Sequence, residues 1–423
     1  MIIRGIIPVK KFCFFLSLCL LLSACSVRPT QAVVEPVMAA PTAPSTPEPI
    51  PEPTPEPTPE PTPVPPAEPV AFRVGDGAYF SDAEPENENL AFLPASSPLT
   101  LESDVPFSQL YLRFTTPPES YTLAAKGFTL ECGQNHYLHE LITLPEPCRS
   151  VTLSVSSGSL MLMRSALFTA GTLPSWVQDW QPPLEKADLM VLSTHNDDDI
   201  LFFGGAEPYY AAELGYGVQV VYFTDQISRS PRMNECLNAL WYMGIRHYPI
   251  FGKFKDFKVG RLDLYYKEIP PEEGKAYLAE NIRRFRPEVV LTQDVNGEYG
   301  HMEHVYMLNL FREVIEETAD ADRYPESAEL YGVWDVPKTY LHIWGERDTQ
   351  TVMDWDMPLA AFDGLPAIEV AQNAYKYHAT EYAKAKHLVE QRDDLYSSYR
   401  FGLYRSLVGE DEAKNDLFEH LGK

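Results

Sequence analysis

The stretch LMVLSTHNDDD, residues 189–199, decides the fold of this chain. It begins with an apolar run of the length of a β-strand, and His195 and a cluster of aspartates follow that run directly. Open α/β sheets bind their ligands at the carboxyl ends of their strands. The stretch therefore predicts an α/β sheet that carries histidine and carboxylate ligands at that edge.

A second stretch of the same kind lies about a hundred residues later, where the apolar run 289–291 is followed by YGHMEH at residues 299–304. Two strand ends with histidine and carboxylate can form a one-metal hydrolytic site, with two or three protein ligands, an open position and a spare carboxylate as base. Consecutive aspartates are also typical of a solvated loop or a helix start, and His-x-x-His pairs arise by chance on helix surfaces. From residue chemistry alone, the metal site and these alternatives stay open.

The composition limits the classes of partner. The 423 residues are enough for two domains with accessory segments. The net charge of -26 makes a surface that repels the phosphates of nucleic acid, so we expect no nucleic-acid partner. Net charge bears on solubility and steering and does not select a substrate.

The N-terminus has the pattern of an export signal. Basic residues precede an apolar stretch at 12–22, which is too short to span a bilayer but suits a signal-peptide core. The stretch ends in LSAC, residues 22–25, which resembles the bacterial lipobox, where the cysteine is lipidated and becomes the first mature residue. We expect a signal peptide over 1–24 and a lipid on Cys25 that anchors the protein at the extracytoplasmic face of the bacterial cell membrane. An ordinary secretory signal is the alternative.

Proline dominates residues 35–70, and a Thr-Pro-Glu-Pro repeat runs through 54–61. Proline lacks a backbone donor, so helix and sheet are excluded and extended polyproline II is the expected state. Segment 25–70 is therefore predicted to be a lipid-anchored stalk, a tether without a binding role.

Residues 71–172 read as a small all-β accessory domain. Short runs at 109–114 and 150–155 alternate apolar and polar residues as half-buried strands do, and no long helical pattern appears. We expect a β-sandwich-like domain. By analogy with other exported enzymes it can bind carbohydrate, and a packing or spacer role is an equal alternative.

Three cysteines remain after the lipidation site. In an exported protein Cys132 and Cys148 can form a disulfide. Cys236 lies in a helix-like stretch, and we expect it to be buried.

From residue 185 to residue 423 strand-like and helix-like segments alternate. The expected strands are 188–193, 218–224, 247–251, 288–293 and 339–344, the expected helices include 231–243 and 273–285, and the last fifty residues read as one or two helices. Near-continuous apolar strands that alternate with helices predict a Rossmann-like, mostly parallel sheet covered by helices on both faces.

Residues 185–423 resemble the PIG-L/LmbE family of zinc-dependent N-acetyl (GlcNAc) deacetylases. The family's opening motif, His-Pro-Asp-Asp-Glu followed by an apolar run and small residues, is matched by His195–Gly205. The resemblance continues, in the family's order, through Arg232-x-x-Glu235, Asp256 and Tyr299-Gly300-His301-x-x-His304. Two positions depart from the motif. Asn196 replaces proline and should be tolerated, since asparagine accepts turn geometry, whereas Asp199 is shorter than the usual glutamate and can miss what that glutamate reaches.

The resemblance implies a metal site. His195, Asp198 and His304 match the zinc ligands of the family and leave a fourth position for water. The expected cofactor is Zn²⁺, and other divalent ions are accepted by the same donors. Asp197 matches the general base, which takes a proton from the metal-activated water as it attacks the acetamide carbon.

The resemblance also implies supporting residues. His301 and Tyr299 match positions that stabilise the oxyanion and protonate the amine. Arg232, Asp256 and Asp199 match positions near the substrate or behind the ligands. For Arg232 a surface salt bridge with Glu235 is an equal alternative. Outside the motifs, His342 and His378 can line the cleft. His387 has no other candidate functional residues near it in the sequence, so we expect no role for it.

Together these features predict a surface-anchored, metal-dependent deacetylase of an N-acetylated glycan or glycoconjugate of the GlcNAc type. The alternatives are a catalytically silent surface lipoprotein that binds glycan, and a hydrolase of a non-sugar N-acyl compound. The metal ligands and Asp197 argue against the silent binder.

Overall fold

The computed structural model describes residues 64–75, 78–80, 91–95, 97–225, 230–257, 260–389, 392 and 396–423. The predicted signal peptide, Cys25 and most of the predicted stalk lie outside the described residues. Within the described part of the chain, no helix has the length and apolar character that crossing a membrane requires.

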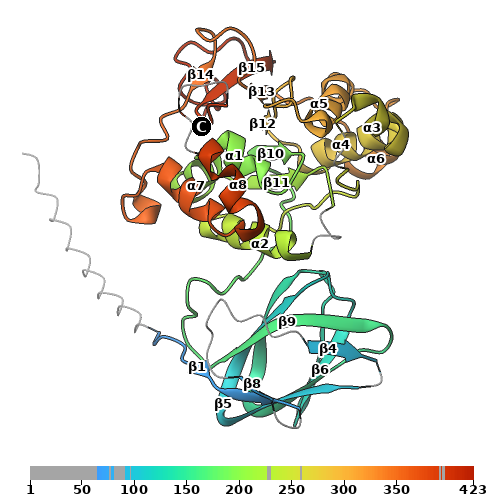
Figure 1. Cartoon of the computed structure of the whole chain (residues 1–423), viewed down its shortest axis with the longest axis vertical. Coiled ribbons are helices and arrows are strands. Elements are labelled where there is room, and N and C mark those ends of the chain that lie inside the picture. Colours follow the sequence, from blue (N-terminus) through green and yellow to red (C-terminus); the bar gives the residue numbers. More distant parts are fainter. Residues whose placement is uncertain are drawn as a thin grey trace, which may run out of the picture. The chain divides into compact units, whose positions relative to one another are not determined.

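The first half of the described chain contains only antiparallel strands (Figure 1). They are β1 (Pro69–Val70), β2 (Phe72–Val74), β3 (Ala78–Phe80), β4 (Ala91–Pro94), β5 (Leu99–Phe114), β6 (Tyr121–Ala125), β7 (Phe128–Cys132), β8 (His139–Ser154) and β9 (Ser159–Phe168). They pair into one nine-stranded sheet because β5 and β8 are long and change register along their length, so β5 pairs with β2, β8 and β9. This arrangement is compatible with the expected all-β accessory domain.

The predicted disulfide is absent, because Cys132 and Cys148 are both free thiols. Cys132 ends β7 and pairs with Tyr121, whereas Cys148 lies in β8 opposite Phe107. In the sheet β6 lies between β8 and β7, which puts the two chains about 9–10 Å apart. A disulfide needs Cα atoms within about 7 Å of each other. Cys236 is buried as expected.

The second half forms the expected mostly parallel α/β sheet. Its strands are β10 (Leu189–Ser193), β11 (Val218–Tyr222), β12 (Val289–Thr292), β13 (Lys338–His342), β14 (Thr351–Val352) and β15 (Arg400–Ser406). The order is β11-β10-β12-β13-β15-β14, in which the first four strands are parallel and the last two are antiparallel. β10 lies between β11 and β12, so its carboxyl end has a neighbouring strand on each side.

Helices cover both faces of this sheet (Figure 1). Leu189 and Val191 pack in one core with residues of α1 (Asp198–Phe203), α2 (Ser230–Tyr242), α7 (Ala367–Tyr375) and α8 (Ala379–Val389). Met190 and Leu192 pack in a second core with residues of α3 (Leu262–Glu268), α4 (Pro271–Phe285) and α5 (Met302–Val314). Because successive side chains of a strand point to opposite faces, one apolar run supplies both cores. The short α6 (Pro325–Tyr331) follows α5.

Two sequence expectations are wrong. Segment 247–251 forms only isolated bridges from His247 to Gln181 and from Ile250 to Val221. The last fifty residues contain all of α8 but also β15, which pairs antiparallel with β13 through a register shift. β15 is partly exposed and lacks the continuous apolar run of the parallel strands.

Candidate metal centre

Two loops at the carboxyl ends of β10 and β12 build the centre, and hydrogen bonds hold them in register. The backbone N–H of Thr194 donates to Gln293 Oε1 at 2.9 Å, and its hydroxyl donates to the same oxygen. Thr224, beyond β11, donates to Thr194 O at 2.8 Å. These hydrogen bonds hold the carboxyl ends of β10, β11 and β12 together. The loops that carry the catalytic side chains therefore start from fixed positions.

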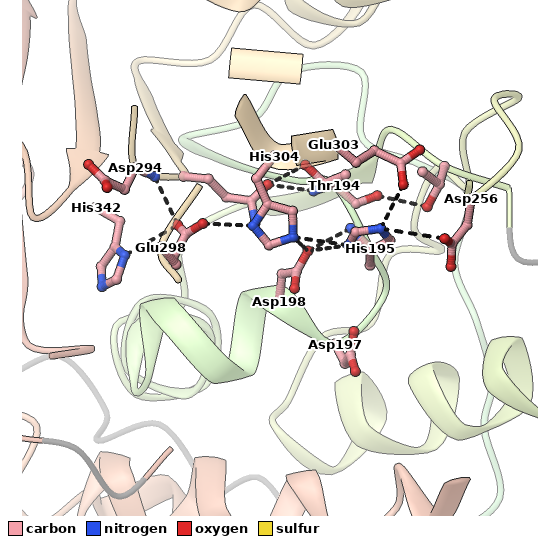
Figure 2. Close-up of polar contacts among 12 residues, drawn as sticks. Thr194, His195, Asp197, Asp198, Asp256, Asp294, Glu298, Glu303, His304 and His342 are labelled. Atoms are coloured by element: carbon pink, nitrogen blue, oxygen red, sulfur yellow. Dashed lines mark hydrogen bonds and ion pairs between the residues drawn. The ribbon is translucent and has the colours of Figure 1, made fainter. Parts of the chain in front are cut away.

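The side chains of His195, Asp198 and His304 converge on one point (Figure 2). His195 Nδ1 lies 2.9 Å from Asp198 Oδ2, His304 Nε2 lies 3.1 Å from the same oxygen, and the two ring nitrogens are 3.1 Å apart. All three residues are buried. Ligand atoms of a tetrahedral zinc ion lie about 3.3 Å from one another, given zinc–ligand distances of about 2.0–2.1 Å. This ligand triangle therefore has the size that a tetrahedral metal ion requires.

Carboxylates on the outer nitrogens set the tautomers of both rings. His195 Nε2 is 3.2 Å from Glu303 Oε2, and His304 Nδ1 is 2.7 Å from Glu298 Oε2. A ring nitrogen that donates to a carboxylate keeps its proton, so the inner nitrogen presents a lone pair. Two lone pairs and a carboxylate oxygen that face one point repel each other unless a cation lies between them. Two imidazoles and one carboxylate are donors that zinc accepts, so the residues fit the metal that the sequence predicts.

The electrostatics of the triangle favour positive charge. Burial by itself would raise the pKa of Asp198, but His304 and His195 outweigh burial and hold that pKa well below its usual range. Burial would lower the pKa of His304, but Asp198 and Glu298 outweigh burial and raise it to about 9. The carboxylate is thus ionised, and without a metal ion the histidines take up protons that a bound divalent ion would displace.

Asp197 lies beside the triangle and is held by α2. Arg232 Nη2 is 2.7 Å from Asp197 Oδ1, and both side chains are buried. Burial raises the pKa of Asp197, and Arg232 opposes the rise without cancelling it. A carboxylate with a raised pKa is a better proton acceptor. The alternative salt bridge from Arg232 to Glu235 is wrong, because Glu235 accepts hydrogen bonds from Thr380 instead.

His301 and Tyr299 lie on the open side of the triangle. The His301 ring is 4.5 Å from the His304 ring and 4.9 Å from the His195 ring, measured between centroids. Burial and the charges of these two histidines lower the pKa of His301 to about 3, so the ring is neutral. Its Nδ1 atom is buried and has no hydrogen-bond partner among the described residues. Tyr299 is 52% exposed, and its ring is 5.9 Å from His301.

The two motif departures have structural roles. Asn196 donates from Nδ2 to Arg232 O at 2.7 Å, which ties the loop to α2 where proline would only stiffen it. Asp199 lies away from the cavity and accepts a hydrogen bond from Tyr222 at 2.9 Å. Burial raises the pKa of Asp199 to about 7. Of the two expected positions, near the substrate or behind the ligands, Asp199 takes the one behind the ligands, where it supports the sheet.

A cavity of about 480 Å³ opens over the centre. Its lining comes from the predicted site and from the C-terminal region: His195, Asp197, Asp198, Leu201, Arg232, Asp256, Tyr299, His301, Glu381, Lys384, Ala385, His387, Leu388 and Tyr396. Asp256 is present as expected, with Oδ1 4.0 Å from His195 Nε2. His387 lines the cavity against expectation, whereas His342 and His378 are buried and do not line it.

Sequence reasoning missed the carboxylates that orient the ligands. Glu303 lies inside the His-x-x-His stretch, where it was visible as a neighbour of both histidines. Glu298 directly precedes Tyr299 and has a left-handed backbone, with φ of 54°. Its Oε1 accepts from the backbone N–H of Asp294 at 2.8 Å, and His342 Nδ1 is 3.3 Å from the same oxygen. The sequence signals for Glu298 were its position at a turn and its place directly before the stretch 299–304.

Comparisons with known proteins agree with this geometry. Residues 190–315 match the family described as "PIG-L: GlcNAc-PI de-N-acetylase". The chain is 26% identical over 186 residues to a 1D-myo-inositol 2-acetamido-2-deoxy-alpha-D-glucopyranoside deacetylase of Catenulispora acidiphila, covering 37% of this chain and 56% of the relative. It is 29% identical over 302 residues to a deacetylase of the same description from Rhodococcus opacus, covering 56% of this chain and all of the relative. The chain thus spans 56% to 60% of the length of three such relatives and the whole of another.

Two solved structures also resemble part of the chain. The conserved protein TT1542 from Thermus thermophilus is 18% identical with a TM-score of 0.38, and covers 53% of this chain and 97% of its own. The N,N'-diacetylchitobiose deacetylase from Pyrococcus horikoshii is 16% identical with a TM-score of 0.38, and covers 53% of this chain and 86% of its own.

Proposed function

Because residues 190–315 form a PIG-L family domain, we propose that this chain is a metal-dependent deacetylase that hydrolyses the N-acetyl group of a GlcNAc-type sugar. The observation that carries the proposal is the ligand triangle of His195, Asp198 and His304 with Asp197 beside it. The deacetylases among the similar proteins act on acetamido sugars by their descriptions, which supports the substrate class.

The triangle would hold the metal ion through His195 Nδ1, Asp198 Oδ2 and His304 Nε2. When bound, a divalent ion such as zinc polarises the acetyl carbonyl as a Lewis acid and makes water more acidic. Glu303 and Glu298 keep the outer ring nitrogens protonated, so both inner nitrogens stay available as ligands.

Asp197 is the proton acceptor in this proposal. Its carboxylate faces the cavity, where it takes a proton from the attacking water. Arg232 fixes its orientation, and burial keeps its pKa high enough for the proton to be held and passed on to the leaving nitrogen.

His301 and Tyr299 serve the carbonyl and the leaving group. The neutral His301 ring and the Tyr299 hydroxyl both offer an N–H or O–H donor at the open side of the triangle. Such donors stabilise the negative charge that develops on the carbonyl oxygen. In this proposal the two residues also assist the protonation of the departing amine by the proton that Asp197 holds.

We also propose that the enzyme is anchored by lipid at Cys25 on the extracytoplasmic face of a bacterial membrane. The LSAC sequence at 22–25 and the proline-rich segment that follows support this location. It would bring the site to envelope or external glycans. Metabolic labelling with a fatty acid tests the anchor, since Cys25→Ser should abolish the label.

The activity is tested with residues 26–423. We expect about one zinc ion per chain by atomic absorption, and release of acetate from N-acetylglucosamine or chitooligosaccharides. Asp197→Asn should lower kcat by about 10²–10⁴-fold because it removes the proton acceptor. The exposed Asp104→Asn serves as the matched control and should not change kcat. Bound metal without acetate release from any sugar would contradict the substrate class.

A further inference from the structure

Building on the proposed function, we propose that α8 forms a second sugar-binding subsite beside the reacting ring, and that this subsite takes a neutral sugar. The natural substrate is then a glycan of at least two rings. Helix α8 lies beyond residue 315, where the family match ends, so the match itself assigns nothing to it.

One face of α8 forms the far wall of the cavity. Glu381, Lys384, Ala385 and Leu388 line the cavity at spacings of i, i+3, i+4 and i+7. This is the stripe that a helix presents to one side. From Glu381 to Leu388 the stripe is about 10 Å long at 1.5 Å per residue, which exceeds the length of one pyranose ring. The wall therefore extends past the sugar whose acetyl group reaches the ligand triangle.

The wall offers both a donor and an acceptor. Lys384 Nζ lies 3.0 Å from Glu381 Oε2 and 3.1 Å from Thr380 O. The Lys384 and Glu381 side chains are 66% and 21% exposed, so both can be reached from the cavity. A sugar hydroxyl donates and accepts at once, and can bridge such a pair. Tyr396 and Tyr299 add aromatic surface to the lining, as sites for small molecules commonly do.

The position of α8 is fixed relative to the proton acceptor. Glu235 of α2 accepts hydrogen bonds from the backbone N–H and the hydroxyl of Thr380, at 3.1 and 2.7 Å. The same helix α2 carries Arg232, which holds Asp197. The proposed subsite and Asp197 are therefore both attached to α2. A second ring bound to α8 would keep a fixed position relative to Asp197.

The charges of the lining favour a neutral ring. The two basic side chains that line the cavity are both engaged, Arg232 with Asp197 and Lys384 with Glu381. An acidic sugar would have to break the Lys384 pair and would face Glu381 and Asp256. A neutral sugar can bind to the Lys384–Glu381 pair while the ion pair stays formed.

The test uses zinc-loaded residues 26–423 and chitooligosaccharides of one to four rings. We expect kcat/KM to rise from the monosaccharide to the disaccharide or trisaccharide. Lys384→Ala and Glu381→Gln should reduce the ratio of kcat/KM for trisaccharide over monosaccharide by about three- to tenfold, the effect of one lost hydrogen bond. Lys386→Ala is the matched control, because Lys386 is exposed on α8 but does not line the cavity.

A binding measurement removes the dependence on turnover. In zinc-loaded Asp197→Asn, calorimetry should give a lower Kd for the trisaccharide than for the monosaccharide, and Lys384→Ala should raise only the trisaccharide's Kd. Equal kcat/KM for all lengths, or equal losses for short and long sugars in Lys384→Ala, would overturn the subsite and leave the proposed function standing. Acetate release from no sugar would overturn both. A higher kcat/KM for hyaluronan oligosaccharides, which alternate N-acetylglucosamine with an acidic sugar, would contradict the proposal that the second subsite takes a neutral sugar.

Discussion

At the scale of single residues, the carboxylate of Glu298 governs His304. Their contact of 2.7 Å keeps the proton on Nδ1 and leaves Nε2 for the metal. We expect Glu298→Gln to weaken zinc affinity by about 10–100-fold, because the amide is a poorer acceptor and lets the ring change tautomer. Competition with a chromogenic chelator measures this affinity. Glu326→Gln, on the exposed side of α6, should leave zinc affinity unchanged.

A second residue-scale prediction concerns Glu207, which is completely buried and has no hydrogen-bond partner for either oxygen among the described residues. Burial and the nearby Asp199 raise its pKa well above the usual range. We expect Glu207→Met to increase the free energy of unfolding by about 1–3 kcal/mol, since an unpaired polar group leaves the core. Urea denaturation measures this, with the exposed Glu185→Met as control. A loss of stability would show that Glu207 has a partner that its surroundings do not reveal.

The two sequence stretches, together with the family resemblance, predicted much of the centre but did not predict the carboxylates that orient its ligands. His195, Asp197, Asp198, His301 and His304 were selected from two short stretches, and the structure brings all five together. The position of Asp199 was left open between the substrate and the region behind the ligands, because three consecutive aspartates look alike until a helix start at Asp198 points them in different directions. Glu298 was not selected, since its contact with His304 depends on a left-handed turn that the sequence pattern indicates only weakly.

At the scale of elements, β6 separates the two cysteines of the accessory sheet. The free thiols should be visible by alkylation of urea-unfolded residues 26–423 without reductant. Mass spectrometry is expected to show three labels, on Cys132, Cys148 and Cys236. A protein that takes only one label before reduction and three afterwards would show that Cys132 and Cys148 are joined.

His139 of β8 connects the accessory sheet to α2 and makes stability depend on pH. Its Nδ1 is 2.7 Å from the Tyr111 hydroxyl, and its Nε2 is 2.7 Å from Asn234 Oδ1. Burial, with Arg113 adding to it, lowers the pKa of His139 well below the ordinary 6.5. The contribution of His139 to stability is therefore complete above pH 6.5 and declines as the pH falls below it.

We expect the free energy of unfolding to fall by up to about 1.4 kcal/mol per pH unit below pH 6.5 through this one residue. Urea denaturation at pH 7.5, 6.5 and 5.5 measures the slope. His139→Gln should be less stable at pH 7.5 but should show a smaller loss between pH 6.5 and 5.5. If the wild-type protein and the variant lose stability equally over that interval, His139 is not the titrating group.

Elements with a continuous apolar run were predictable, and edge elements were not. β10 and β12 are buried on both faces, so their sequences have to be apolar throughout. β15 has five residues of intermediate exposure, and its pairing with β13 comes from tertiary contact. Residues 247–251 have an apolar pattern but only isolated bridges, because the chain there touches β11 at one residue.

At the scale of the whole molecule, the net charge of -26 should act on the substrate before it binds. Acidic glycans are repelled at long range, and salt screens that repulsion with a Debye length of about 8 Å at physiological ionic strength. We expect kcat/KM for an acidic oligosaccharide to increase between 0.02 and about 0.3 M salt, while the value for a neutral chitooligosaccharide stays nearly constant. An acidic substrate whose kcat/KM falls with salt would indicate a local basic surface that overrides the net charge.

The position of the C-terminal region at the cavity could not be predicted from the sequence. The cavity wall on α8 comes from residues about 185 positions after the first ligand, and no motif marks it. The packing of α8 against α1, α2 and α7 brings this wall to the site. The accessory sheet was expected to bind glycan or to act as a spacer. Among the strand residues of this sheet whose side chain burial the structure describes, Val105 is exposed, and neither expected role is tested by this.

The short segment before β1 decides how mechanical load enters the protein. Ala67 donates to Thr172 O and Thr172 donates to Pro65 O, both at 2.9 Å, so the chain enters and leaves the accessory sheet at the same place. Gly171 permits this close approach, since a Cβ atom there would lie 2.5 Å from Pro65 O. A pull on the N-terminal side passes through these backbone bonds directly to residue 172 and on to the α/β half. We therefore expect the strands of the accessory sheet to carry little of this tension.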